Sequence, residues 1–221
     1  MRHVASLSLG AALLFLSQVV GAASPGWYAG VGVGESNFDI SKEDLGVSDA
    51  QLAAQLPAYG LTGSADLDDT DTAWKLFAGY RFNSFFSLEG GYVDLGETVV
   101  DLTLTDGVQT ATVHAKAESE GFTLAAVGIA PVRPRFSVFG KVGAYFADTD
   151  GRISAAGPAG VLATSSDASE TEVLVGVGAS FALLKNVSLR IEYERYDDVG
   201  DDDEFGEADI DLASASVSIG F

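Results

Sequence analysis

The C-terminal segment, residues 206–221 (GEADIDLASASVSIGF), constrains the fold most, because apolar and small polar residues alternate along it. Phe221, Ile219 and Val217 fall on one side, and small polar residues fall on the other. A period of two is typical of a β-strand, and an apolar face opposite a small polar face fits a strand between lipid and a barrel lumen. A soluble sandwich can also end on such a strand, so the rest of the chain has to supply matching strands.

Alternating segments recur along the chain and predict an all-β fold, an eight-stranded antiparallel transmembrane β-barrel. The predicted strands cover residues 26–38, 71–82, 85–104, 110–130, 136–148, 171–183, 188–196 and 206–221. Short turns follow the second, fourth and sixth strands, and mostly longer polar connections follow the others. Pairing the last strand with the first would satisfy every strand edge, as lipid requires.

Three stretches are less regular than these strands. Residues 39–71 are long and acidic, and they predict an exposed loop with a short helix after Ser48. Residues 151–169 are rich in small side chains and predict a loop or a hairpin extension turning at Gly157 and Pro158. In the fourth strand both faces are apolar or small near residues 124–129, so its lumen and lipid faces stay unassigned.

The N-terminus predicts export. Arg2 precedes an apolar run that closes on small residues, so residues 1–23 are expected to be a cleaved signal peptide and residues 24–221 the barrel domain. The run is too short for a membrane anchor. No second long apolar run follows, so no transmembrane helix is expected in the mature chain.

Composition excludes several functions. The chain has no Cys, which rules out disulfides and thiolate metal sites. A formal net charge of −20 argues against nucleic acid as a partner, since a binding face needs clustered Lys and Arg. We expect no cofactor.

The motifs WYAGVGVGESNF, WKLFAGYRFN, FSLEGGYVDLG, FGKVGAYFAD and LRIEYERYDD resemble the transmembrane domain of the OmpA family over essentially the whole mature chain. The resemblance implies a Gram-negative outer-membrane barrel, with lipid and lipopolysaccharide around it and an assembly signal at Phe221 that the barrel-assembly machinery recognises. We also expect a monomer. Larger members add a peptidoglycan-binding domain, which is not expected here.

The same resemblance implies a lumen filled with paired charges. Glu89, Lys141 and Arg190 match the family by motif position, while Ser180 stands where a second interior acid is expected. Inward-facing positions on the predicted strands complete the expected interior ion-pair cluster, which consists of Lys75, Arg81, Glu89, Lys141, Arg190 and Glu192.

Two other candidate sites are weaker. Some small outer-membrane barrels are lipid A deacylases or acyltransferases that use His, Ser and an acid. His114 has Ser119 and Glu120 nearby in sequence, but no flanking pattern marks a nucleophile, so a rim histidine is favoured. The acidic segment that holds the weak metal candidates Asp201, Asp202, Asp203 and Glu204 lacks the regular spacing of a calcium loop, so a solvated loop is favoured.

A structural role in the outer membrane, with surface loops available for contacts, is therefore the expected function. The alternative is a narrow channel or a conduit for small hydrophobic molecules, because eight strands leave an interior just wide enough for side chains to fill. An enzyme that modifies lipid A is the least expected.

Overall fold

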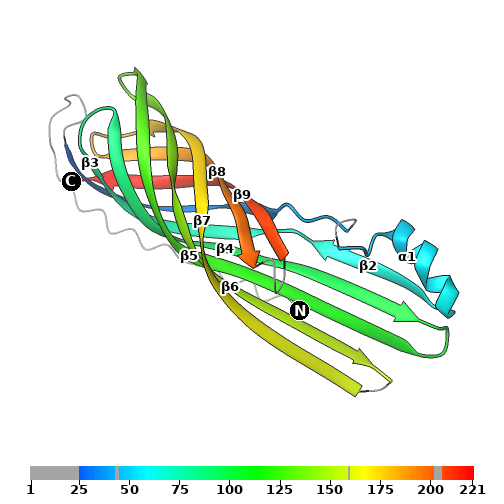
Figure 1. Ribbon diagram of the computed structural model, residues 1–221. Helices are drawn as coiled ribbons and strands as arrows, with labels where there is room; N and C mark the ends of the chain where they lie inside the picture. The colour runs from blue at the N-terminus through cyan, green and yellow to red at the C-terminus, as the bar shows by residue number, and fades with distance from the viewer. Residues whose placement is uncertain (1–24, 43–44, 159, 202–205) are drawn as a thin grey trace.

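The computed structural model describes residues 25–42, 45–158, 160–201 and 206–221, so the expected signal peptide lies outside the described residues. Eight strands form a closed antiparallel ring, in which β9 pairs with β1 (Figure 1). In ring order the strands are β1 (Gly26–Phe38), β3 (Thr70–Arg81), β4 (Phe86–Thr105), β5 (Thr110–Arg133), β6 (Phe136–Gly157), β7 (Gly160–Ala182), β8 (Val187–Asp201) and β9 (Gly206–Gly220). The eight-stranded barrel prediction is confirmed.

The alternation along each strand separates the lumen from the outer wall. On β8, Ile191 is 63% exposed, whereas its neighbour Glu192 is 5% exposed inside the ring. The faces of β5 are now assigned, because Phe122 is 61% exposed outside and Ala125 is 4% exposed inside. The sequence left this strand ambiguous because Ala and Gly stand on both of its faces there.

Lumen-facing glycines make room for large interior side chains. A Cβ at Gly30 would collide with the ring of Phe77, and one at Gly178 would collide with the ring of Phe139. Both rings can therefore lie flat against the wall of a narrow barrel.

A ninth strand, β2 (Thr62–Asp68), corrects the prediction that residues 39–71 form only a loop with a short helix. The helix is present as α1 (Asp49–Gln55), with Ser48 as its N-cap, and a 3₁₀ turn, η1 (Leu56–Tyr59), follows it. The strand β2 pairs with the far half of β4 and lies outside the ring.

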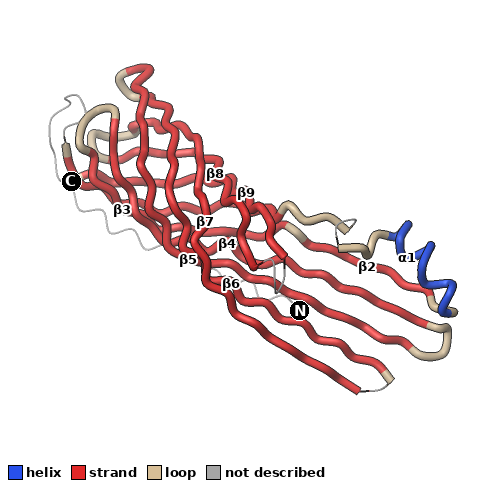
Figure 2. The backbone as a smooth tube through the Cα atoms, viewed as in Figure 1, coloured by secondary structure: helices blue, strands red, loops and turns tan. Residues whose placement is uncertain are grey.

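The strands β4 to β7 continue well beyond the ring (Figure 2). The connection between β4 and β5 is a tight turn at residues 106–109, and the stretch 151–169 is a hairpin extension, as one of the two alternatives had it. We call β2 together with residues 97–105, 110–118, 150–157 and 160–167 the extension.

The helical segment covers the extension at the β2 edge. Leu52 is buried there, and Leu56 lies over Gly63 on the face that continues the lumen wall. The Nζ of Lys42 donates a hydrogen bond to the backbone carbonyl of Ala65 in β2. Neither helix in the described part of the chain is long and apolar enough to cross a membrane.

Candidate functional site in the barrel lumen

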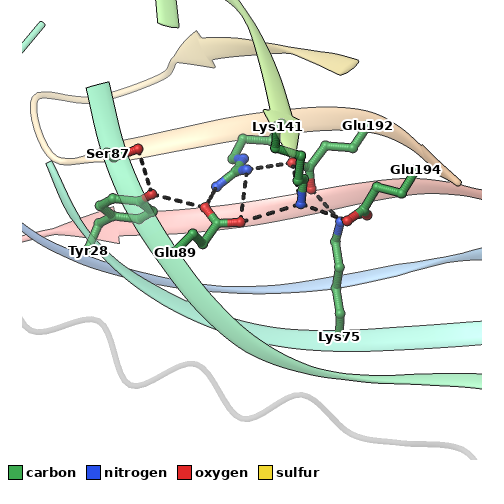
Figure 3. A network of polar contacts seen from close by, with 8 residues as sticks. Tyr28, Lys75, Ser87, Glu89, Lys141, Glu192 and Glu194 are labelled. Atoms are coloured by element: carbon green, nitrogen blue, oxygen red, sulfur yellow. Dashed lines mark hydrogen bonds and ion pairs between the residues drawn. The ribbon is translucent and has the colours of Figure 1, made fainter. Parts of the chain in front are cut away.

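A network of six buried charged side chains crosses the middle of the lumen (Figure 3). The strands β3, β4 and β6 each supply one residue, and β8 supplies three at alternate positions. The members are Lys75, Glu89, Lys141, Arg190, Glu192 and Glu194, and we call them the lumen cluster.

Each cation of the lumen cluster contacts more than one carboxylate. Lys75 bridges Glu192 and Glu194. The Nζ of Lys141 lies 2.6 Å from Oε1 of Glu194 and 3.5 Å from Oε1 of Glu89. These contacts join the near and far walls of the barrel.

Arg190 holds the centre of the lumen cluster. Its Nη1 donates to Oε2 of Glu89 at 2.7 Å, and its Nη2 donates to Glu192. Its guanidinium also lies 4.5 Å from the ring centroid of Phe77 and 4.7 Å from that of Phe139, in the range of cation–π attraction. The planar group is therefore fixed by carboxylates at its edge and aromatic rings at its faces.

The three cations and three carboxylates of the lumen cluster balance. Burying an ion costs several kcal/mol unless a partner compensates it, so an equal number of each sign is the arrangement that a narrow lumen tolerates. Tyr28 extends the network toward the short-turn end, because its hydroxyl donates to Glu89 at 3.0 Å and lies 3.1 Å from Oγ of Ser87.

An apolar layer fills the lumen between the cluster and the extension. Tyr145 and Tyr196 lie at its centre with ring centroids 4.9 Å apart, and Ser119 forms a 3.0 Å hydrogen bond with the Tyr145 hydroxyl. The apolar members of the layer are Phe38, Ala73, Val93, Leu95, Ala125, Tyr145, Ala147, Leu174, Tyr196, Val199, Ile210 and Leu212. Two successive layers of side chains thus occupy the lumen.

Five of the six expected cluster residues lie together, and Arg81 does not. Its guanidinium lies 6.0 Å from the ring centroid of Tyr28, nearer the short-turn end, and no ion pair involves it among the described residues. Glu194 takes the sixth place. The alternation Arg190, Glu192, Glu194 along β8 is the signal that could have identified it.

The weaker candidate sites find little support. His114 points outward and pairs with Asp101 at 2.8 Å, whereas Ser119 points into the lumen, so the two residues that are close in sequence lie on opposite faces. Asp202, Asp203 and Glu204 lie outside the described residues, and Asp201 is described through its backbone pairing with Gly206. Within the described ranges no three His, Asp or Glu side chains are arranged to hold a metal ion.

The family model of the OmpA-like transmembrane domain matches residues 22–221. The chain belongs to this family. It is therefore an outer-membrane β-barrel protein, as the motifs indicated. A search of curated proteins found no match.

Similar solved structures are also small barrels. Ail of Yersinia pestis is 15% identical, with 90% of this chain and 100% of Ail covered and a TM-score of 0.45. Neisserial surface protein A is 16% identical, with 91% of this chain and 99% of that protein covered and a TM-score of 0.46. OprG of Pseudomonas aeruginosa is 12% identical, with 92% of this chain and 97% of OprG covered and a TM-score of 0.48.

Proposed function

We propose that this protein is a structural barrel of the outer membrane, whose lumen is sealed and whose extension faces the outside. The observation that carries this proposal is the charge-balanced lumen cluster stacked against the apolar layer, because both fill the lumen with side chains. Long extracellular segments opposite short periplasmic turns are the usual orientation of such barrels.

Purified protein in a planar lipid bilayer tests the sealed lumen. We expect no discrete conductance steps across the range of voltages at which open barrels conduct. Reproducible single-channel openings would contradict the structural role and favour the channel.

A narrow channel is the second candidate, and one observation favours it. The buried hydroxyls of Ser214 and Ser216 on β9 and the buried Nε of Arg190 have no hydrogen-bond partner in the described structure. Polar atoms in this state favour a thin hydrated path along the β9 wall. If such a path conducts, Ser216→Val should reduce the current, whereas the outward-facing Val217→Leu should not.

The surroundings of the barrel follow from its outer wall. We propose contact with outer-membrane lipid and lipopolysaccharide, a monomeric state, removal of residues 1–23, and recognition by the barrel-assembly machinery through the last strand. Phe221 supports the last point, since its side chain is exposed beside the β9–β1 seam while its N–H donates to the Trp27 carbonyl at 3.0 Å. Deleting Phe221 should lower the amount of barrel that reaches the outer membrane, measured by fractionation.

We propose no catalytic activity. His114 is the one histidine among the described residues. It contacts Asp101 on an exposed face of the sheet, whereas the lumen cluster is buried inside the barrel. Incubation with purified lipopolysaccharide should leave its acyl chains unchanged, as mass spectrometry of lipid A would show.

A further inference from the structure

The strand β7 has a free edge in the extension. It pairs with β6 from Gly160 to Phe181, but β8 pairs with it only from Val173 onward. Within the described ranges no strand or other backbone group is hydrogen-bonded to the opposite side of residues 160–171. This side presents a row of backbone donors and acceptors available to another chain.

Asp167 and Glu170 are the charges on this edge, and other common protections against strand addition are missing from it. Residues 160–171 (GVLATSSDASET) contain no Lys and no Pro, and the pairing with β6 has no bulge along them. Val161 and Leu162 are 75% and 77% exposed. The other edge of the extension, β2, is covered by the helical segment and by Lys42.

The two faces beside the free edge differ in chemistry. On the outer face, Asp167 lies opposite Asp150, which lies opposite Glu118, so an acidic row runs across three strands to the edge. On the inner face, Leu162 continues an apolar row through Ala155 and Val113. A strand added here would place an outer-face side chain beside Asp167, next to the basic pair Lys116 and Arg152, and an inner-face side chain beside Leu162.

We propose that the free edge of β7 binds an extended segment of a partner protein, in which basic and apolar residues alternate, by adding that segment to the sheet. Backbone hydrogen bonds supply binding, and the alternation supplies selectivity. The inference rests on the proposed placement in the outer membrane, which turns the extension outward. A second copy of this chain fits poorly, because its own edge, residues 160–171, carries acids and no basic residue.

The test uses the full chain in lipid nanodiscs and a labelled synthetic ten-residue peptide of alternating Val and Lys. We expect saturable binding by fluorescence anisotropy and slower amide hydrogen exchange in residues 160–171. A peptide with a central Pro loses ladder hydrogen bonds and should bind roughly tenfold more weakly or worse, equivalent to about 1.4 kcal/mol. A peptide of alternating Val and Glu should also bind more weakly.

Charge reversal supplies the matched control. Asp167→Lys should weaken binding of the Val–Lys peptide and strengthen that of the Val–Glu peptide, whereas Asp66→Lys on the β2 edge should change neither. Unaltered exchange in residues 160–171, equal binding of the Pro peptide, or protection that depends on protein concentration without peptide would overturn the inference. Each sample is also run boiled and unboiled on a denaturing gel. If the mobility shifts on boiling but no peptide binds, the inference is refuted and the proposed function stands.

Discussion

Single residues matter most in the lumen, where Glu89 contacts both Arg190 and Lys141. We predict that Glu89→Ala lowers the free energy of unfolding by about 3–5 kcal/mol, because it leaves buried cations uncompensated. Urea unfolding in lipid vesicles measures this. Glu35→Ala, at an exposed position on β1, is the control and should change stability by about 0.5 kcal/mol or less.

The double-mutant cycle with Arg190→Ala tests whether the two residues act as a pair. The double variant should lose less stability than the sum of the two single variants, since removing both partners removes the uncompensated charge. Strict additivity would show that the contact between Glu89 and Arg190 contributes no coupling energy.

Lys75 and Arg81 are both inward-facing cations on β3, but within the described ranges only Lys75 of the two contacts carboxylates. We therefore predict that Lys75→Met costs about 3–5 kcal/mol, whereas Arg81→Met costs about 1 kcal/mol or less. The same vesicle unfolding assay compares them. An equal cost for both would contradict the position of Arg81 outside the lumen cluster.

Alternation predicted that Arg81 faces inward, and it does; what the sequence could not supply was height along the barrel axis. Neighbouring strands are tilted and staggered, so the level at which a side chain enters the lumen depends on the register of all eight strands. Glu89 and Arg190 were placed through a family motif. Glu194 shares their face, but no family motif position marks it as a member of the cluster.

At the scale of strands, the last strand separates lipid from lumen most cleanly. Val217 faces outward and Ser218 is buried inside. We predict that Val217→Arg lowers the free energy of unfolding by about 2–4 kcal/mol near the membrane midplane and lowers the refolding yield with it, whereas Ser218→Thr has a small effect. Gel-monitored refolding into vesicles measures both. Similar yields would mean that the assigned faces are reversed.

The β6–β7 hairpin is expected to respond to pH. A hydrogen bond with Asp167 raises the pKa of Asp150 above its ordinary value, and Glu118, Asp148 and Arg152 are the neighbouring charges. At pH values between the ordinary and the raised pKa, the folded hairpin therefore holds a proton that the unfolded hairpin releases. Its contribution to stability is present at acidic pH and is lost as pH rises through the raised pKa.

Amide exchange of the hairpin tip, corrected for the intrinsic pH dependence of exchange, measures this response. We expect faster exchange once Asp150 ionises. Asp150→Asn keeps a hydrogen-bond donor without a titrating proton, so it should flatten the profile. If Asp150→Asn and the natural chain showed the same dependence of amide exchange on pH, titration of Asp150 would not be the cause of the response.

The elements outside the ring were the hardest to predict, for a physical reason. Residues 62–68 (TGSADLD) carry few apolar groups, and their strand is held by pairing with β4 residues that lie more than thirty positions away. Local pattern cannot reveal such pairing. The small residues of 151–169 likewise allow a loop or a hairpin until the partner strand is known.

The whole molecule combines a closed ring with an open sheet. In the ring, β9 pairs with β1 and every strand has two neighbours, which satisfies backbone groups that lipid cannot. In the extension, water can satisfy the free edge of β7, so an open edge is tolerated there. The ring should consequently fold without the tip of the extension.

Replacing residues 152–165 of the β6–β7 hairpin with a four-residue turn tests this independence. The cut leaves the lumen cluster, the apolar layer and the β7–β8 pairs from Val173 onward intact. We predict that the trimmed protein still runs differently before and after boiling on a denaturing gel and remains a monomer by light scattering in detergent. If the trimmed protein lost this difference in mobility while full-length protein on the same gel kept it, the extension would be part of the cooperative unit that closes the barrel.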